Sequence, residues 1–132
     1  MRKALKFLPA LFVIIFGLSC SSSTRPNTDD LVFPETGVYY SLLVERYLNQ
    51  TCAWGGCHDQ ISKQGGIDLS TYNAIFMTPG LVIPGNADGS LLNQIIEARL
   101  PHPQLPNLYR GTDNQIRGMR VWVLEGALFI KP

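Results

Sequence analysis

Glycine and proline recur along the whole chain and limit the length of any regular element. The 132 residues include 12 glycines and nine prolines. Glycine weakens a helix interior and proline interrupts it, so helices in this chain are expected to be short. This excludes a long coiled coil, and the sequence shows no internal repeat of the kind that builds a solenoid. The length is that of one domain.

The charges are almost balanced, with 11 Lys and Arg residues against 10 Asp and Glu residues. Nucleic-acid-binding domains usually carry a strong basic excess, so this composition argues against that class. The apolar fraction is 45% and the charged fraction is 16%, which gives the chain enough apolar surface to fold rather than stay disordered.

Two stretches near the ends of the expected domain show the helical spacing of apolar residues. Residues 38–49 place valine, leucine and tyrosine side chains on one helix face. Residues 113–125 follow Thr112, which makes a capping-box pattern with Gln115 three positions later. The sequence therefore predicts a helix at each end of the domain.

Two shorter helices are expected between them. One is capped by Ser70 and runs through Phe76, and the other is capped by Asp88 or Ser90 and runs through Leu100. Three prolines within the next six residues prevent the second helix from continuing. The expected fold class is therefore all-α, with three to five short helices and long loops.

The beginning of the chain has the pattern of a secretory signal peptide. Three basic residues precede a mostly apolar stretch at residues 7–18, shorter than the about 20 residues that a membrane-spanning helix needs. Ser19-Cys20 and the serines after it resemble a bacterial lipoprotein signal, although Gly17 stands where an aliphatic residue is usual. The alternative is an ordinary signal peptide with a spare cysteine. We expect a signal peptide at 1–19, an acylated Cys20, a flexible tether at 20–36 and a folded domain at 37–130.

Removal of residues 1–19 changes the charge balance. Three of the 11 basic residues lie in that segment, which leaves eight against 10 acidic residues. A mildly acidic exported domain has no electrostatic reason to bind nucleic acid or an anionic lipid surface. The expected attachment is the lipid anchor at Cys20, on the periplasmic side of the inner or outer membrane or at the cell surface.

The run from Cys52 to His58 reads Cys-Ala-Trp-Gly-Gly-Cys-His. It contains both of the cysteines that remain if Cys20 carries the lipid anchor. A cysteine pair that ends in Cys-His is typical of covalent haem attachment, in which two thioethers hold the haem and the histidine is the proximal iron ligand. Two residues usually separate the cysteines, whereas four separate Cys52 from Cys57. Gly55 and Gly56 give the longer loop its backbone freedom.

Other roles are open for the same residues. A disulfide between Cys52 and Cys57 suits an exported protein, because oxidising compartments favour disulfides. A zinc site is weaker, because no second Cys/His pair follows at zinc spacing. A Cys-Cys-His run without any role is the weakest interpretation.

The segments after this run follow an order that resembles a known family. They are Gly-Gly-Ile-Asp-Leu at 65–69, a Pro-Gly-Asn turn with Ser-Leu-Leu at 84–92, a proline-rich loop, and a last helix with Trp122 and Gly126-Ala127. Over residues 38–127 this order resembles the c-type cytochrome domains of exported bacterial proteins, including the planctomycete-type cytochrome domains. Four-residue spacing between the cysteines also occurs in that group.

The resemblance implies a cytochrome c-like fold with one haem c per chain. Cys52 and Cys57 then carry the thioethers, and His58 is the proximal iron ligand. The two terminal helices are expected to cross beside the haem, with Tyr47 and Trp122 packed near its edge or simply buried in the core. The implied function is electron transfer rather than catalysis, with a redox partner protein that the sequence does not identify.

The second axial ligand is the main departure from the family. Where members have Met-Pro-Pro, this chain has Leu105-Pro106, and leucine cannot bind iron. His102 lies three residues before Leu105 and is the only other histidine. Met77 follows a short helix, and Met119 fits the apolar pattern of the last helix. Three possibilities stay open: His102, a methionine, or no protein ligand, which leaves the iron open to a small gas or peroxide.

Three residues beside the proline-rich loop, Arg99, Tyr109 and Arg110, are candidates for contacts with haem propionates or for ordinary solvated surface. The sequence thus favours a membrane-tethered monohaem cytochrome c that transfers electrons. The competing function is a haem-free lipoprotein, pinned by a Cys52–Cys57 disulfide, that serves as a binding or accessory subunit. A Soret absorption band distinguishes the two.

Overall fold

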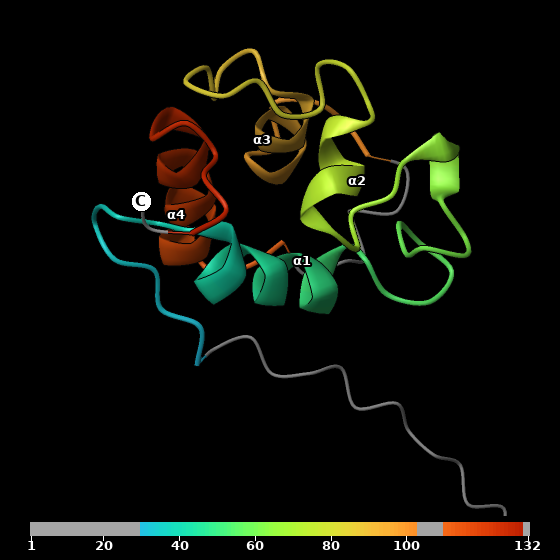
Figure 1. Cartoon of the computed structure of the whole chain (residues 1–132), viewed down its shortest axis with the longest axis horizontal. Helices are drawn as coiled ribbons and strands as arrows, with labels where there is room; N and C mark the ends of the chain where they lie inside the picture. The colour runs from blue at the N-terminus through green and yellow to red at the C-terminus, as the bar shows by residue number, and fades with distance from the viewer. Residues whose placement is uncertain (1–29, 103–109, 131–132) are drawn as a thin grey trace, which may run out of the picture.

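The structure, a computed structural model, describes residues 30–102 and 110–130. These residues form four α-helices and no strand: α1 (Glu45–Thr51), α2 (Tyr72–Phe76), α3 (Leu91–Ile96) and α4 (Asp113–Leu124) (Figure 1). A π-helical turn (Tyr40–Val44) leads into α1, and a 3-10 turn (Gln64–Gly66) lies in the loop before α2. The expected all-α fold of short helices and long loops is therefore confirmed. No helix in the described ranges is long and apolar enough to cross a membrane.

The last helix begins and ends almost as its sequence predicts. Thr112 Oγ1 accepts the backbone N–H of Gln115 (3.3 Å), and Gln115 Oε1 accepts the N–H of Thr112 (3.0 Å), which completes the capping box. α4 ends at Leu124, one residue before the expected end, and Gly126 follows in the left-handed region at φ +96°. The helix contributes Met119, Trp122 and Val123 to the core.

The first helical segment starts at residue 40 rather than 38 and ends at 51 rather than 49. The backbone N–H groups of Gly37 and Val38 donate to the carboxylate of Glu125 at 2.9–3.0 Å. The N–H of Tyr40 donates to the carbonyl of Leu128 at 3.0 Å. Gly37 lies at φ +72° and Tyr39 is extended at φ −124° and ψ 147°, so the helix begins only at Tyr40.

The two short helices each differ from expectation at one end. Thr71, not Ser70, caps α2 by accepting the N–H of Ala74 (3.3 Å). The Ser70 hydroxyl donates instead to the Asp68 carboxylate (2.6 Å). α3 follows the expected N-cap residue, Ser90, but ends four residues before the expected position.

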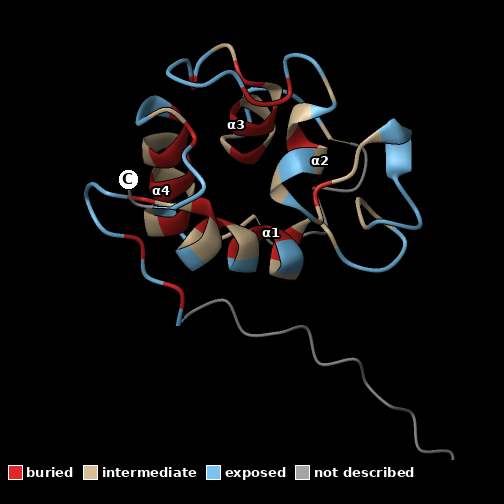
Figure 2. Ribbon diagram, viewed as in Figure 1, coloured by how far each residue is buried: buried red, intermediate tan, exposed pale blue. Residues whose placement is uncertain are grey.

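The core extends into chain that precedes the expected domain. Leu31 and Phe33 are 3% and 2% exposed, and a Cβ placed on Gly118 of α4 would come within 2.2 Å of the Phe33 ring. Figure 2 shows buried residues both on the inner faces of the helices and in this leading segment. The packed domain therefore includes residues 31–33 of the expected tether. The expected signal peptide and Cys20 lie outside the described residues.

Candidate functional site

A cavity lies where the loop after α1, the chain before α2 and helix α3 meet. Its volume is about 140 Å³. The apolar wall consists of Ile67, Leu69, Leu81 and, from α3, Leu91, Leu92, Ile95 and Ile96. The remaining lining residues are Tyr47, Thr51, Cys52, Cys57, His58, His102 and Arg110. The cavity is therefore mainly apolar, with a few polar and sulfur-bearing side chains.

Both cysteines and both histidines that the sequence singles out line this one cavity. Cys52, Cys57 and His58 belong to the loop after α1, and His102 belongs to the segment after α3. The convergence of two separate chain segments on one apolar space is a feature of binding sites for a prosthetic group.

Cys52 is held at the end of α1. Its backbone N–H donates to the carbonyl of Leu48 (2.8 Å), and its Sγ lies 3.2 Å from the hydroxyl oxygen of Thr51. Burial raises the pKa of the Cys52 thiol to about 11. The thiol is therefore protonated at neutral pH, and it is not joined to Cys57.

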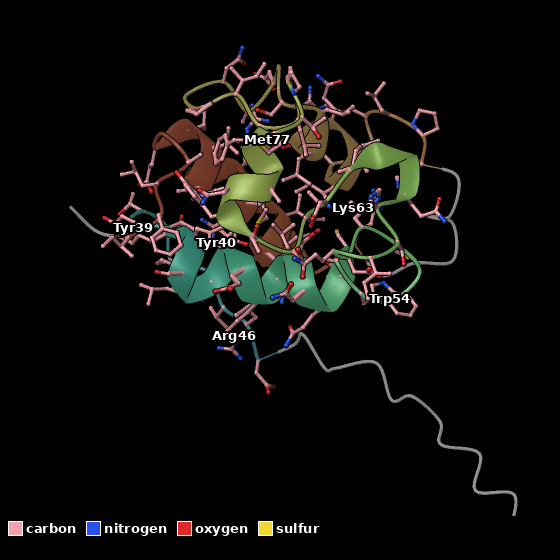
Figure 3. The ribbon with its side chains drawn as sticks, turned by 45° about the vertical axis from the view of Figure 1, so that its right-hand side comes forward. Tyr39, Tyr40, Arg46, Trp54, Lys63 and Met77 are labelled. Atoms are coloured by element: carbon pink, nitrogen blue, oxygen red, sulfur yellow. The ribbon has the colours of Figure 1, made fainter. Side chains whose placement is uncertain are left out.

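The four residues between the cysteines form a closed turn. The N–H of Cys57 donates to the carbonyl of Trp54 (3.0 Å), and the N–H of His58 donates to the carbonyl of Cys52 (3.1 Å). Gly56 lies at φ +88°, so the expected need for glycine freedom is met at this position. Trp54 is 42% exposed at the outer edge of the loop (Figure 3).

The ring of His58 is oriented by the chain after the 3-10 turn. Its Nδ1 lies 3.3 Å from the carbonyl oxygen of Ile67. The carbonyl of His58 also accepts the N–H of Leu69 (2.8 Å), which ties the two segments together. Because a carbonyl oxygen can only accept, this contact favours the tautomer with the proton on Nδ1. Nε2 then keeps the lone pair that a metal needs.

His102 lies next to His58 in the cavity. The centres of the two imidazole rings are 5.8 Å apart, and the ring planes are inclined by 70°. Partial burial, and secondarily the neighbouring His58, lower the pKa of His102. Both influences favour the neutral imidazole, which is the form that binds metals.

The methionines among the described residues lie elsewhere. Met77 is 81% exposed after α2, and Figure 3 shows it at a different part of the surface from Trp54. Met119 is fully buried in the core, as its sequence pattern predicts. Neither side chain lines the cavity. Leu105, the residue that aligns with the family methionine, is outside the described residues.

The other candidates divide between the cavity and the rest of the fold. Arg110 lines the cavity, and Tyr47 lines it too, with its hydroxyl donating to the Arg110 carbonyl. Arg99 pairs instead with Glu97 (2.8 Å). Trp122 is a core residue whose Nε1 donates to the carbonyl of Leu128 (3.0 Å). Tyr109 lies outside the described residues.

Two contributors to the site have little signal in the sequence. The orienting atom for His58 is a backbone oxygen, that of Ile67, and any residue type could supply it. Thr51 donates to the carbonyl of Tyr47 (2.7 Å) and so holds its hydroxyl beside Cys52, a contact that only the helix end creates. The apolar residues of α3 follow a helical pattern that is visible in the sequence. That pattern does not indicate that they face the cysteines.

The donor groups that line the cavity are two thiols and two imidazoles. Within residues 30–102 and 110–130, no three Cys, His, Asp or Glu side chains gather closely enough to hold an ion by themselves. Two unpaired thiols, one histidine with a directed Nε2 and an apolar wall are the groups that a c-type haem uses. A porphyrin is larger than the cavity, so its binding requires the walls to move apart or one haem edge to remain in solvent.

Neither a family model, a curated protein nor a solved structure matches this chain.

Proposed function

We propose that this protein is a monohaem c-type cytochrome that carries electrons outside the cytoplasm. The observation that carries the proposal is the convergence of Cys52, Cys57 and His58 on one apolar cavity, with the His58 ring oriented by the Ile67 carbonyl. The resemblance of residues 38–127 to exported cytochrome domains supports the same function.

The residues of the cavity have distinct roles in this proposal. Cys52 and Cys57 hold the haem through thioether bonds, and His58 Nε2 binds its iron. The haem supplies a centre that gains and loses one electron reversibly. The Ile67 carbonyl fixes the His58 ring and increases the basicity of its Nε2. The α3 wall excludes water and lowers the local dielectric, which helps to set the reduction potential.

The hydrogen bonds within the cysteine loop support haem attachment over a structural disulfide. Cys52 and Cys57 are not joined to each other, yet the loop between them is already closed by hydrogen bonds from the N–H groups of Cys57 and His58. The loop therefore does not need a disulfide to hold its shape, and both sulfurs remain available to a haem.

Protein made in cells with a cytochrome c maturation system is expected to show a Soret band. Reduction should shift this band and sharpen the visible bands, and reoxidation should restore the first spectrum, because the bound iron exchanges one electron reversibly. Absorption spectra recorded with dithionite and then ferricyanide provide the measurement. A colourless protein, from cells that mature a second c-type cytochrome normally, would contradict the proposal.

We also propose that Cys20 anchors the protein to a membrane through attached lipid. Two or three acyl chains give stable anchoring, whereas a single chain is marginal. Cys20→Ala should therefore move the protein from the membrane fraction to a soluble or unprocessed form. Fractionation together with acyl labelling measures this, and Ser22→Ala serves as the matched control. Unchanged membrane binding of the Cys20 variant, with no acyl label on the wild type, would defeat this part of the proposal.

A further inference from the structure

The geometry points to His102 as the second axial ligand of the iron, across from His58. This inference rests on the proposed function, because it needs the haem held by Cys52 and Cys57. It makes the centre a bis-histidine haem rather than the His/Met centre that the family resemblance implies. The consequences are a low-spin iron and a lower reduction potential than thioether ligation gives.

The separation of the two imidazoles fits an iron between them. Two rings bound in line on opposite sides of a metal, at the metal–nitrogen distance of about 2.0 Å known for imidazole on zinc, have centres roughly 6 Å apart. The His58 and His102 ring centres are 5.8 Å apart. Rings that share one metal axis can take any mutual inclination, so the observed 70° is compatible with axial ligation.

The chain after α3 directs His102 to the cavity. Ala98 adopts the left-handed conformation at φ +58°, and the N–H groups of Arg99 and Leu100 both donate to the carbonyl of Gln94 (2.8 and 3.0 Å). This turn ends the helix, and His102, which follows it, lines the same cavity as the cysteine loop. Pro101 fixes its own φ, and Pro103 disfavours the helical region for His102, the residue before it, so His102 samples fewer conformations. The imidazole is thus presented at little entropic cost.

The competing side chains of the described residues do not reach this position. Met77 is 81% exposed and Met119 is fully buried, and neither lines the cavity. The rest of the wall is apolar apart from Tyr47, Thr51 and Arg110. A thioether ligand would therefore require a methionine to leave its present environment, whereas His102 already lines the same cavity as His58.

Ferric spectra of the holoprotein test this inference. The wild type should be low-spin and lack the near-infrared sulfur–iron band. His102→Ala should become high-spin, and added imidazole should restore the low-spin spectrum. His102→Met should remain low-spin, gain the sulfur–iron band and have a higher midpoint potential. Leu100→Ala is the matched control, because Leu100 is two residues away and does not line the cavity.

The outcomes separate this inference from the proposed function. Two results would contradict His102 as the ligand and leave the proposed cytochrome function intact. One is a wild type that carries covalent haem but is already high-spin, and the other is a spectrum that does not change in His102→Ala. A sulfur–iron band in the wild type does the same and indicates a methionine. If His102→Ala does not accumulate, His102→Met decides, because an unchanged spectrum and potential in that variant contradict ligation. Absence of haem from the wild type overturns both proposals.

Discussion

Replacing both Cys52 and Cys57 with serine is expected to reduce covalently bound haem from one per chain to none. A serine hydroxyl has almost the shape of the thiol but is a far weaker nucleophile and forms no thioether. Each single variant should keep one thioether and accumulate less holoprotein. Haem staining of denatured protein, after extraction with acid acetone, measures the loss.

The control for this experiment is Met77→Ser, which removes an exposed sulfur outside the cavity and should leave staining unchanged. Full staining of the double variant would show that the haem is held by other groups. No haem staining in either the wild type or the double variant would show that neither thiol carries haem. Either result contradicts the proposed attachment.

Trp122→Ala is expected to cause the largest loss of stability among alanine truncations in α4. The side chain is fully buried, and its Nε1 donates to the Leu128 carbonyl (3.0 Å). The centres of the Trp122 and Tyr40 rings are 6.1 Å apart. Truncation of a buried tryptophan typically costs about 3–5 kcal/mol. That is a large share of the roughly 5–15 kcal/mol by which a domain is stable.

Chemical denaturation followed by circular dichroism gives the free energy of unfolding for this comparison. Leu124→Ala is the matched control, because Leu124 lies on the same helix with its side chain 51% exposed. Its effect should stay within about 0.5 kcal/mol. A Trp122 variant as stable as the Leu124 variant would contradict the central packing role of the indole.

Elements with local signals were predictable from the sequence. The capping box at Thr112 and Gln115 lies within one turn, and it sets the start of α4 without help from distant residues. The cysteine run and its glycines also form one short segment, so its closed turn follows from residues that are neighbours in the chain. The all-α fold class rested on signals of this kind.

Features that depend on distant contacts were not predictable in this way. The chain at the start of the first helical segment donates hydrogen bonds to Glu125 and Leu128, which lie near the other end of the domain. The early end of α3 depends on a left-handed Ala98, a conformation for which alanine has no preference. The burial of Phe33 likewise depends on Gly118, because a Cβ at that position would come within 2.2 Å of the Phe33 ring.

The candidate site combines both kinds of feature. Cys52, Cys57 and His58 were identified from their spacing alone. His102 was a candidate only as the other histidine in the chain. The residues around it in the sequence do not indicate that its ring centre lies 5.8 Å from the ring centre of His58. That proximity arises from the turn after α3, whose geometry has no counterpart in the residue pattern.

In the proposed cytochrome, Cys52 and Cys57 carry one haem through thioether bonds. The most direct test of this attachment is the intact mass of the denatured, acid-acetone-extracted protein. We predict that the wild type exceeds the Cys52→Ser/Cys57→Ser variant by one haem, once the replaced sulfurs are taken into account. A wild-type mass equal to that of the polypeptide, or lower by the hydrogens lost in a disulfide, would contradict this attachment.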